Sequence, residues 1–310
     1  MTLDADVAAA LEALLALDAP ALSQGTVAEA RANYDAAPKP RGDDVSRVED
    51  LVVPGSAGDV PVRVYAASDA ENLPMVAFFH GGGWVLSSVD GHDSLARRIA
   101  VRTGALVVSV DYRLAPEHPF PAPHDDCWAV TSWLARHGAE IGGDPSRLAV
   151  CGDSAGGNLA AGVALRARDE GIDLALQALI YPCIDDRQDR YESMVENGEG
   201  LFLTADDMVW FWDHFVPSNE RLNPYAVPAR AADLSGCAPA YVQTAQYDPL
   251  RDEGEHYAAR LRSAGVEVDV TRYPGVVHGF VSRWHVMARA ADAHHDLANA
   301  LVAAFEERSG

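Results

Sequence analysis

The sequence predicts a doubly wound α/β fold built around a mostly parallel sheet. Short apolar runs, each long enough for one strand, recur along the chain, and stretches with helical spacing of apolar residues separate most of them. Runs that are apolar at every position are typical of strands buried on both faces, as in a parallel sheet covered by helices. The alternation of the two kinds of element therefore indicates this fold class.

The N-terminal segment, residues 1–45, is predicted to be helical. Residues 3–17 carry leucines and a valine at the spacing of an amphipathic helix. Thr26 opens a second helix, because Glu29 follows three residues later as a capping-box partner. Pro and Gly residues around 38–42 end that helix.

The period of apolar residues changes to that of strands from about residue 46. Val60, Val62 and Val64 alternate with polar residues, so the first predicted strand is exposed on one face. Six further apolar runs predict buried strands, at 74–80, 105–112, 147–153, 174–182, 239–248 and 266–274. The helices predicted between or after them are 92–102, 122–138, 155–169, 252–264 and 284–307.

One segment, residues 184–236, interrupts this alternation and divides the predicted core into 46–183 and 237–310. Within it Thr204 can cap a helix whose first turn carries acidic residues, where the helix dipole favours them. The next apolar residues fall on one face of that helix: Met208, Phe211, Trp212 and Phe215. The helix either packs on the core or forms a lid over a pocket, and its position in the chain favours the lid.

The chain is strongly acidic, with 46 Asp and Glu against 24 Lys and Arg residues and a formal net charge of −22. Nucleic-acid binding needs clustered Lys and Arg to neutralise phosphates, so this class of protein is excluded. An anionic membrane surface is disfavoured for the same reason. Two explanations of the acidity stay open, the composition of a GC-rich genome and adaptation to high salt.

The expected location is the cytoplasm. The four cysteines form no CxxC pair and are too few for a disulfide scaffold, so we expect reduced, mostly buried thiols: Cys127, Cys151, Cys183 and Cys237. The apolar N-terminus lacks the basic region of a signal peptide and is interrupted by acidic residues, Asp4, Asp6, Glu12 and Asp18. No apolar run reaches the length that spans a membrane, so no membrane insertion is expected.

The most informative motif is Gly-Asp-Ser-Ala-Gly-Gly at 152–157, which lies between a predicted buried strand and a predicted helix. This is the setting of a nucleophile elbow, in which a serine on a sharp turn needs small residues two positions before and after it. The helix that follows directs its N–H groups and positive dipole end toward the serine. Ser154 is therefore the candidate nucleophile, against the alternative of a tight structural turn.

A second motif, His80-Gly-Gly-Gly-Trp84, follows the predicted strand 74–80. Consecutive glycines let backbone N–H groups approach a substrate without Cβ atoms in the way. Acyl transfer needs such donors at the oxygen that becomes negative in the tetrahedral intermediate. We expect the N–H groups of Gly81, Gly82 and Ala155 to form this oxyanion hole. The alternative of a phosphate loop lacks the Lys and Ser or Thr that it requires.

A serine nucleophile also needs a base and an acid that orients the base. His278 is the one histidine after Ser154 that lies in a loop just beyond a predicted strand, whereas the others fall on helical stretches or in the insertion. Asp248 ends the preceding strand and is favoured as the acid. Asp252 is its rival in the same loop, but is expected to cap the next helix.

Five motifs in this order resemble the hormone-sensitive-lipase family of carboxylesterases: HGGGW at 80–84, DYRLAPEHPFPA at 111–122, GDSAGG at 152–157, YDPLRDEG at 247–254 and HGF at 278–280. The resemblance implies an α/β-hydrolase fold with a mostly parallel eight-stranded sheet, flanking helices and a helical cap to which residues 1–45 contribute. It assigns Ser154, Asp248 and His278 to the triad and Gly81, Gly82 and Ala155 to the oxyanion hole.

The resemblance further implies a serine esterase that acts on short- to medium-chain acyl esters. Apolar residues of the glycine loop and the insertion would line the substrate pocket: Trp84, Phe202, Phe211, Trp212 and Phe215. No metal or organic cofactor is indicated, and a homodimer is left open. Amidases, formamidases and lactonases share this machinery and remain alternatives, as does a receptor on the same scaffold, although His278 argues against the latter.

Polar residues beside these motifs are interpreted as structural. Asp111, Arg113 and Glu117 are expected to form internal ion pairs or hydrogen bonds. His80 is expected to hold the glycine loop, and Asp153 to support the site next to the nucleophile rather than to shuttle protons.

Overall fold

The computed structural model describes residues 2–16 and 21–308, so residue 1 and residues 17–20 of the predicted N-terminal segment, Asp18 included, lie outside the described residues. One sheet of eight strands crosses the described chain in the order β1-β2-β4-β3-β5-β6-β7-β8. The strands are β1 (Arg47–Gly55), β2 (Gly58–Ala66), β3 (Leu73–Phe79), β4 (Leu106–Val110), β5 (Gly143–Asp153), β6 (Gln177–Ile180), β7 (Ala240–Tyr247) and β8 (Val268–Val277). Strands β1 and β2 pair antiparallel with their neighbours and the remaining pairs are parallel, which confirms the mostly parallel sheet.

Strand β1 was missing from the predicted strands. It pairs with β2 along its whole length, from Arg47 opposite Ala66 to Gly55 opposite Gly58, at the edge of the sheet. Only Val53 of its residues is buried. Because an edge strand can be held by backbone hydrogen bonds with little apolar burial, its sequence lacks the pattern that identifies the other strands.

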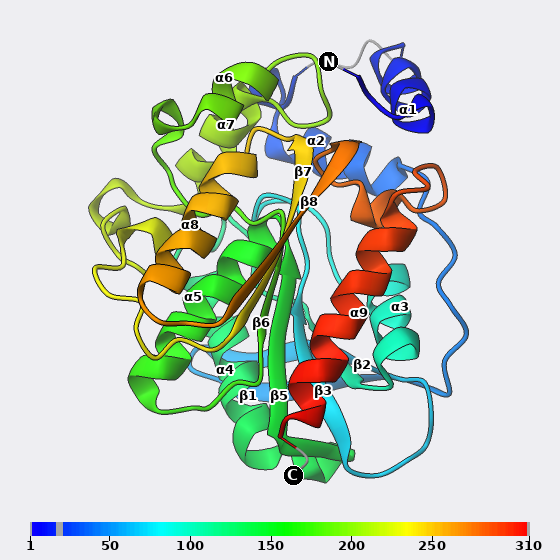
Figure 1. The fold of residues 1–310 in the computed structure, drawn as a ribbon, viewed down its shortest axis with the longest axis vertical. Helices are drawn as coiled ribbons and strands as arrows, with labels where there is room; N and C mark the ends of the chain where they lie inside the picture. The colour runs from blue at the N-terminus through cyan, green and yellow to red at the C-terminus, as the bar shows by residue number, and fades with distance from the viewer. Residues whose placement is uncertain (1, 17–20, 309–310) are drawn as a thin grey trace.

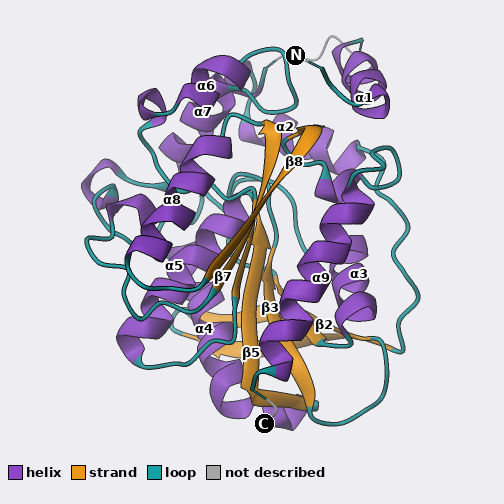
Figure 2. Ribbon diagram, viewed as in Figure 1, coloured by secondary structure: helices purple, strands orange, loops and turns teal. Residues whose placement is uncertain are grey.

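Helices cover both faces of the sheet (Figure 2). They are α1 (Ala5–Leu15), α2 (Val27–Ala36), α3 (Asp93–Thr103), α4 (Ala122–His137), α5 (Ala155–Glu170), α6 (Glu192–Asn197), α7 (Ala205–Phe215), α8 (Arg251–Ser263) and α9 (Ala290–Glu306). The alternation of side chains along β3 shows the two layers: Ala77 and Phe79 pack with α4, α5 and α8, whereas Val76 and Phe78 pack with α3 and α9.

The predicted helix 284–307 begins later than expected, at Ala290. The preceding residues form a short 3₁₀ turn, Val281–Arg283, and further turns, so His285 lies in this connection and not on the helix. Val281 and Met287 are fully buried there, which indicates that the connection is held by packing before the chain enters α9.

The inserted segment contributes α6 and α7, which lie with α1 and α2 at the end of the molecule where β7 and β8 terminate (Figure 1). Thr204 and Asp207 form a reciprocal capping box at the start of α7. The predicted apolar face of α7 is buried, and the Phe215 ring stacks on the Trp84 indole with their centroids 4.2 Å apart. The same box occurs at α2 between Thr26 and Glu29, as predicted.

All four cysteines are buried and free, which confirms the prediction of buried thiols. Burial raises the thiol pKa of each of them above its usual range. Across the described residues, no helix combines the length and the apolar character needed to cross a membrane.

His294 makes the stability of the fold depend on pH. Its imidazole is almost wholly buried on α9, lies 2.9 Å from the Val281 carbonyl through Nε2, and has its pKa lowered to about 4 by burial and by the nearby charge of Arg98. An unfolded histidine has a pKa near 6.5, so between these values the unfolded chain binds one more proton than the folded chain at this site. Stability is therefore lost as the pH falls below about 6.5, by about 1.4 kcal/mol per pH unit.

We predict that His294→Gln, which can still donate to the Val281 carbonyl, reduces this acid sensitivity. The free energy of unfolding, measured with urea at pH 6.5 and pH 4.5, should fall by about 2 kcal/mol less in the variant than in the wild type. An equal fall in the two proteins would show that His294 is not held neutral by the fold.

Candidate active site

Ser154 lies on a sharp turn between the end of β5 and the start of α5. Its backbone adopts φ 56° and ψ −119°, a strained conformation for a residue with a side chain, and its N–H donates to the Ile180 carbonyl over 2.8 Å. A Cβ atom on Gly152 would overlap the Gly156 carbonyl, and one on Gly156 would overlap the Phe79 carbonyl. The close approach of three backbone segments therefore requires the glycines that flank the serine.

Ser154, His278 and Asp248 are joined by two hydrogen bonds. His278 Nε2 lies 2.9 Å from Ser154 Oγ, and His278 Nδ1 lies 2.8 Å from Asp248 Oδ2. Asp248 follows β7 and is fully buried, and its other oxygen accepts the Leu250 N–H over 2.8 Å. His278 follows β8. The structure thus brings the three predicted residues into one chain of side chains.

Asp252 does not contact His278. Its carboxylate accepts hydrogen bonds from the Ser193 N–H and from Arg251 Nε, at 2.8 and 2.7 Å. The expectation that it caps the following helix is wrong, because α8 begins at Arg251 and its N-cap is Leu250. The Leu250 N–H donates to the Asp248 carboxylate, and α8 begins directly after this turn, one residue before Asp252. Asp252 therefore lies inside the first turn of α8, and its N–H donates to Ser193 of α6.

Tyr181 and Cys183, which follow β6, also contact the triad. The Tyr181 ring packs against the His278 imidazole with centroids 4.6 Å apart, and its backbone has a positive φ of 34°. Cys183 Sγ lies 4.0 Å from Ser154 Oγ. Neither residue was predicted to belong to the site. Their position just beyond a parallel strand was a usable signal, since such strand ends meet at one edge of the sheet.

A buried polar network holds the glycine loop to the end of β5. Asp153 Oδ1 accepts the Gly81 N–H over 2.9 Å, and Asp153 Oδ2 lies 3.2 Å from His92 Nε2. Burial opposes ionisation of Asp153, but the charge and hydrogen bond of His92 and the Gly81 N–H outweigh it, so its pKa is lowered. His80 stacks on Tyr112 and contacts the Gly81 carbonyl over 2.7 Å, and burial lowers its pKa to about 3. Both residues therefore support the loop, as predicted.

The assignment of Gly81 to the oxyanion hole is wrong. Its N–H already donates to an ionised carboxylate and is not available to a substrate oxygen. The N–H groups of Gly82, Gly83 and Ala155 have no acceptor within the part of the chain that the structure describes. Gly82 and Gly83 have positive φ angles of 115° and 61°, and Cβ atoms there would overlap the Leu86 carbonyl and the Phe211 ring. The open donors thus begin one residue later than predicted.

The aromatic residues predicted to line a pocket fall into two groups. Trp84, Trp212 and Phe215 are essentially unexposed and pack on one another, so they fix α7 to the glycine loop and offer no free surface to a ligand. This corrects their assignment as pocket walls. Phe211 lies against Gly83, and Phe202 is half-buried beneath the guanidinium of Arg283.

Arg31 of α2 fastens the N-terminal segment to the glycine loop, residues 80–85. Its guanidinium donates to the Val85 and Ala115 carbonyls at 2.9 and 3.0 Å and forms a two-pronged ion pair with Glu117. Arg113 pairs in the same way with Asp126. Asp111 accepts a hydrogen bond from the Val89 N–H. The structural roles predicted for Asp111, Arg113 and Glu117 are confirmed.

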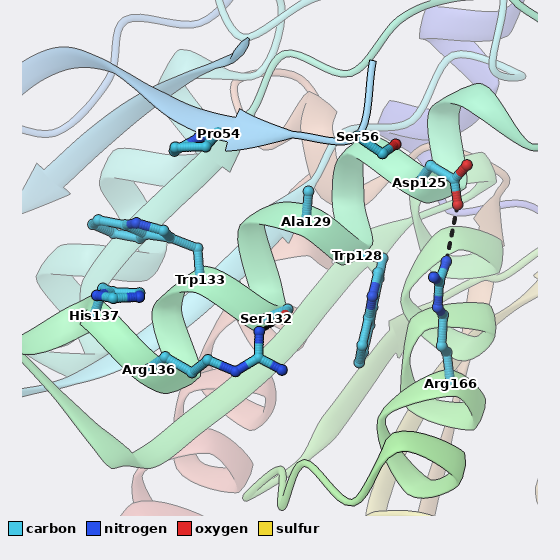
Figure 3. A pocket seen from close by; sticks show the side chains of 10 residues that line it. All are labelled: Pro54, Ser56, Asp125, Trp128, Ala129, Ser132, Trp133, Arg136, His137 and Arg166. Atoms are coloured by element: carbon cyan, nitrogen blue, oxygen red, sulfur yellow. Dashed lines mark hydrogen bonds and ion pairs between the residues drawn. The ribbon is translucent and has the colours of Figure 1, made fainter. Parts of the chain in front are cut away.

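A separate cleft of about 300 Å³ lies on the outer side of α4 (Figure 3). Its lining comes from the β1–β2 hairpin, α4 and α5: Pro54, Ser56, Asp125, Trp128, Ala129, Ser132, Trp133, Arg136, His137 and Arg166. Arg166 lies over the Trp128 indole and pairs with Asp125. The cleft shares no residue with the triad or the glycine loop.

Comparisons with known proteins identify the family to which the chain belongs. Residues 76–282 match the family described as alpha/beta hydrolase fold. The chain is 47% identical over 242 residues to Carboxylesterase NlhH of Mycobacterium tuberculosis (strain ATCC 25618 / H37Rv), covering 76% of this chain and 75% of that protein. It is 37% identical over 241 residues to the Arylesterase of Saccharolobus solfataricus, covering 77% and 78%. Among solved structures, a hyperthermophilic esterase from the archaeon Pyrobaculum calidifontis has a TM-score of 0.91 at 41% identity, covering 98% of this chain and 99% of that one.

Proposed function

The chain belongs to the alpha/beta hydrolase fold family and is a carboxylesterase of the hormone-sensitive-lipase type, and on this premise we propose that Ser154, His278 and Asp248 perform the hydrolysis. The observation that carries the proposal is the continuous chain of hydrogen bonds from Ser154 Oγ through the His278 ring to the buried Asp248 carboxylate. Such a chain delivers a proton acceptor to the serine hydroxyl and fixes the tautomer of the imidazole.

The reaction proceeds in two steps through an acyl-enzyme. His278 Nε2 takes the Ser154 proton as Oγ attacks the ester carbonyl, and the imidazolium is stabilised by Asp248 at Nδ1. The imidazolium then protonates the leaving alcohol. A water molecule, deprotonated by the same nitrogen, hydrolyses the acyl-enzyme and restores the serine.

The oxyanion of both tetrahedral intermediates binds the N–H groups of Gly82, Gly83 and Ala155. These donors are open, and Ala155 opens α5, so the positive end of the helix dipole adds to the attraction. Asp153 is a positioning residue, because it holds the loop through Gly81 without a donor of its own. One donor of this kind contributes about 3 kcal/mol to transition-state stabilisation.

The substrates we propose are short- to medium-chain acyl esters, received under a cap formed by residues 1–45 and 184–236. Two contacts support this cap: Arg31 binds the glycine loop, and α7 packs on Trp84 of the same loop. The packed side chains of Trp84, Trp212 and Phe215 fill the space between the glycine loop and α7. An acyl chain directed toward this space is therefore limited in length.

The triad is tested by three substitutions measured side by side. Ser154→Ala should lower kcat for p-nitrophenyl butyrate by about four to six orders of magnitude, and Asp248→Asn by about four, because His278 loses its orienting partner. Asp252→Asn is the matched control and should cost less than about tenfold. A serine-directed phosphonate should label the wild type and not Ser154→Ala. A larger loss in Asp252→Asn than in Asp248→Asn would reverse the assignment of the acid.

The oxyanion assignment is tested by Gly82→Ala. The added Cβ would meet the Leu86 carbonyl at a backbone angle that alanine does not adopt, so the loop must shift and its donors lose their aim. We expect kcat to fall by about 100-fold or more. Gly104→Ala is the control, since Gly104 also has a positive φ but ends α3 in open space. Comparable losses of kcat in the two variants would contradict the assignment.

The acyl preference is tested with p-nitrophenyl esters from acetate to palmitate, and a p-nitroanilide as the amide control. We expect kcat/KM to be highest for acyl chains of about two to eight carbons and to fall for longer ones, because the filled space behind the loop excludes them. A maximum at palmitate would overturn the limit on chain length, and faster cleavage of the anilide would indicate an amidase.

A further inference from the structure

Arg283 lies in the turn that follows His278 and contacts both the catalytic loop and the inserted segment. Its Nη1 donates to the carbonyl of Gly279, the residue after His278, over 2.9 Å. Its guanidinium carbon lies over the Phe202 ring, 4.7 Å from the ring centre. The cation is therefore held in place by two contacts near His278.

The charge of Arg283 acts on side chains around the active site. Burial raises the pKa of the Tyr34 and Tyr181 hydroxyls, and the Arg283 charge opposes this rise in both. Tyr181 is the ring that packs on His278, and Tyr34 belongs to α2, the helix that binds the glycine loop. Arg283 therefore lies close enough to both Tyr181 and Tyr34 for its charge to act on their hydroxyls.

Arg283 lacks the counter-ion that most arginines of this acidic chain have. No carboxylate of the described residues lies within ion-pair distance of it, although the side chain is half-buried. Its Nε and Nη2 groups donate to no described residue, since Nη1 makes its hydrogen bond to Gly279. These two groups form one edge of the guanidinium fork, and that edge matches the two oxygens of a carboxylate.

We propose that Arg283 is a substrate-binding residue that receives a carboxylate, and that the preferred substrates are esters bearing a second, free carboxylate group. The inference rests on the proposed function, because the carboxylate must belong to a molecule whose ester group reaches Ser154. An arginine already held in place by Phe202 and Gly279 loses little freedom on binding, so the contact favours acidic esters over neutral ones of the same size.

The test compares esters that differ only in this charge. One set is the monoethyl esters of succinic, glutaric and adipic acid, each against the carboxamide in which the free carboxylate is replaced by an amide. A second pair, 4-carboxyphenyl acetate and 4-carbamoylphenyl acetate, places the charge on the alcohol side. Acid release in a pH-stat gives kcat/KM for each, and the measured quantity is the ratio of carboxylate to carboxamide.

We expect a ratio of about 10 or more in at least one set for the wild type, lowered by about 10- to 100-fold in Arg283→Gln and partly kept in Arg283→Lys. Arg136→Gln is the matched control. Arg136 is an exposed arginine on the outer face of α4 that also lacks an ion pair to any described residue, so the variant makes the same change in net charge away from the triad. Its ratio should equal that of the wild type.

Each contrary result has its own meaning. A wild-type ratio of one or less in both sets, a ratio unchanged in Arg283→Gln, or an equal fall in Arg136→Gln overturns the inference. A displaced His278 in Arg283→Gln would lower hydrolysis of both members of a pair alike, so the ratio stays informative. Hydrolysis of the carboxamide esters that persists in Ser154→Ala would instead overturn the proposed function.

Discussion

The geometry of the site depends on the hydrogen bonds that the Asp153 carboxylate makes with the Gly81 N–H and with His92. This carboxylate lies at the end of β5, next to Ser154, and reaches across to both partners. Because the group is buried, its charge depends on these partners for stabilisation, and each partner is fixed in return. The glycine loop is thereby tied to the strand that carries Ser154. Trp84 and α7 are in turn built on that loop.

Much of the fold could be predicted because the sequence repeats its pattern at every core element. The buried strands β3 and β4 are apolar at nearly every residue, and β5 carries a continuous apolar run over 148–151. Helices α2 and α7 each begin with a threonine cap that precedes acidic residues. The edge strand β1 escaped prediction because it has a single buried residue. The start of α9 was placed too early because Met287, buried in the turns before the helix, lies three residues ahead of the buried Ala290 and so continues its apolar spacing.

For the site, too, some features follow from the sequence motifs and others depend on tertiary contacts. Ser154, Asp248 and His278 each follow a strand in the chain order of the motifs, so their proximity was a fair expectation. The loss of Gly81 as a donor depends on the register of β3 and β5, which sets Phe79 opposite Gly152 and brings Asp153 within reach. The sequence did not predict Arg283 as a site residue, because the missing counter-ion of an arginine can be recognised only once its neighbours in the folded chain are known.

The order of the strands in the sheet sets the order in which the groups of the site lie along its edge. The glycine loop, Ser154, the Tyr181 turn, Asp248 and His278 follow β3, β5, β6, β7 and β8, which are successive neighbours in the sheet. The strand ends that carry these groups are therefore set apart by the roughly 4.8 Å repeat between hydrogen-bonded strands, which backbone geometry fixes. The chain leaves the sheet after β6, passes through residues 184–236, and returns to the sheet at the neighbouring strand β7. The inserted segment can therefore diverge in length and composition while the reacting atoms keep their separation.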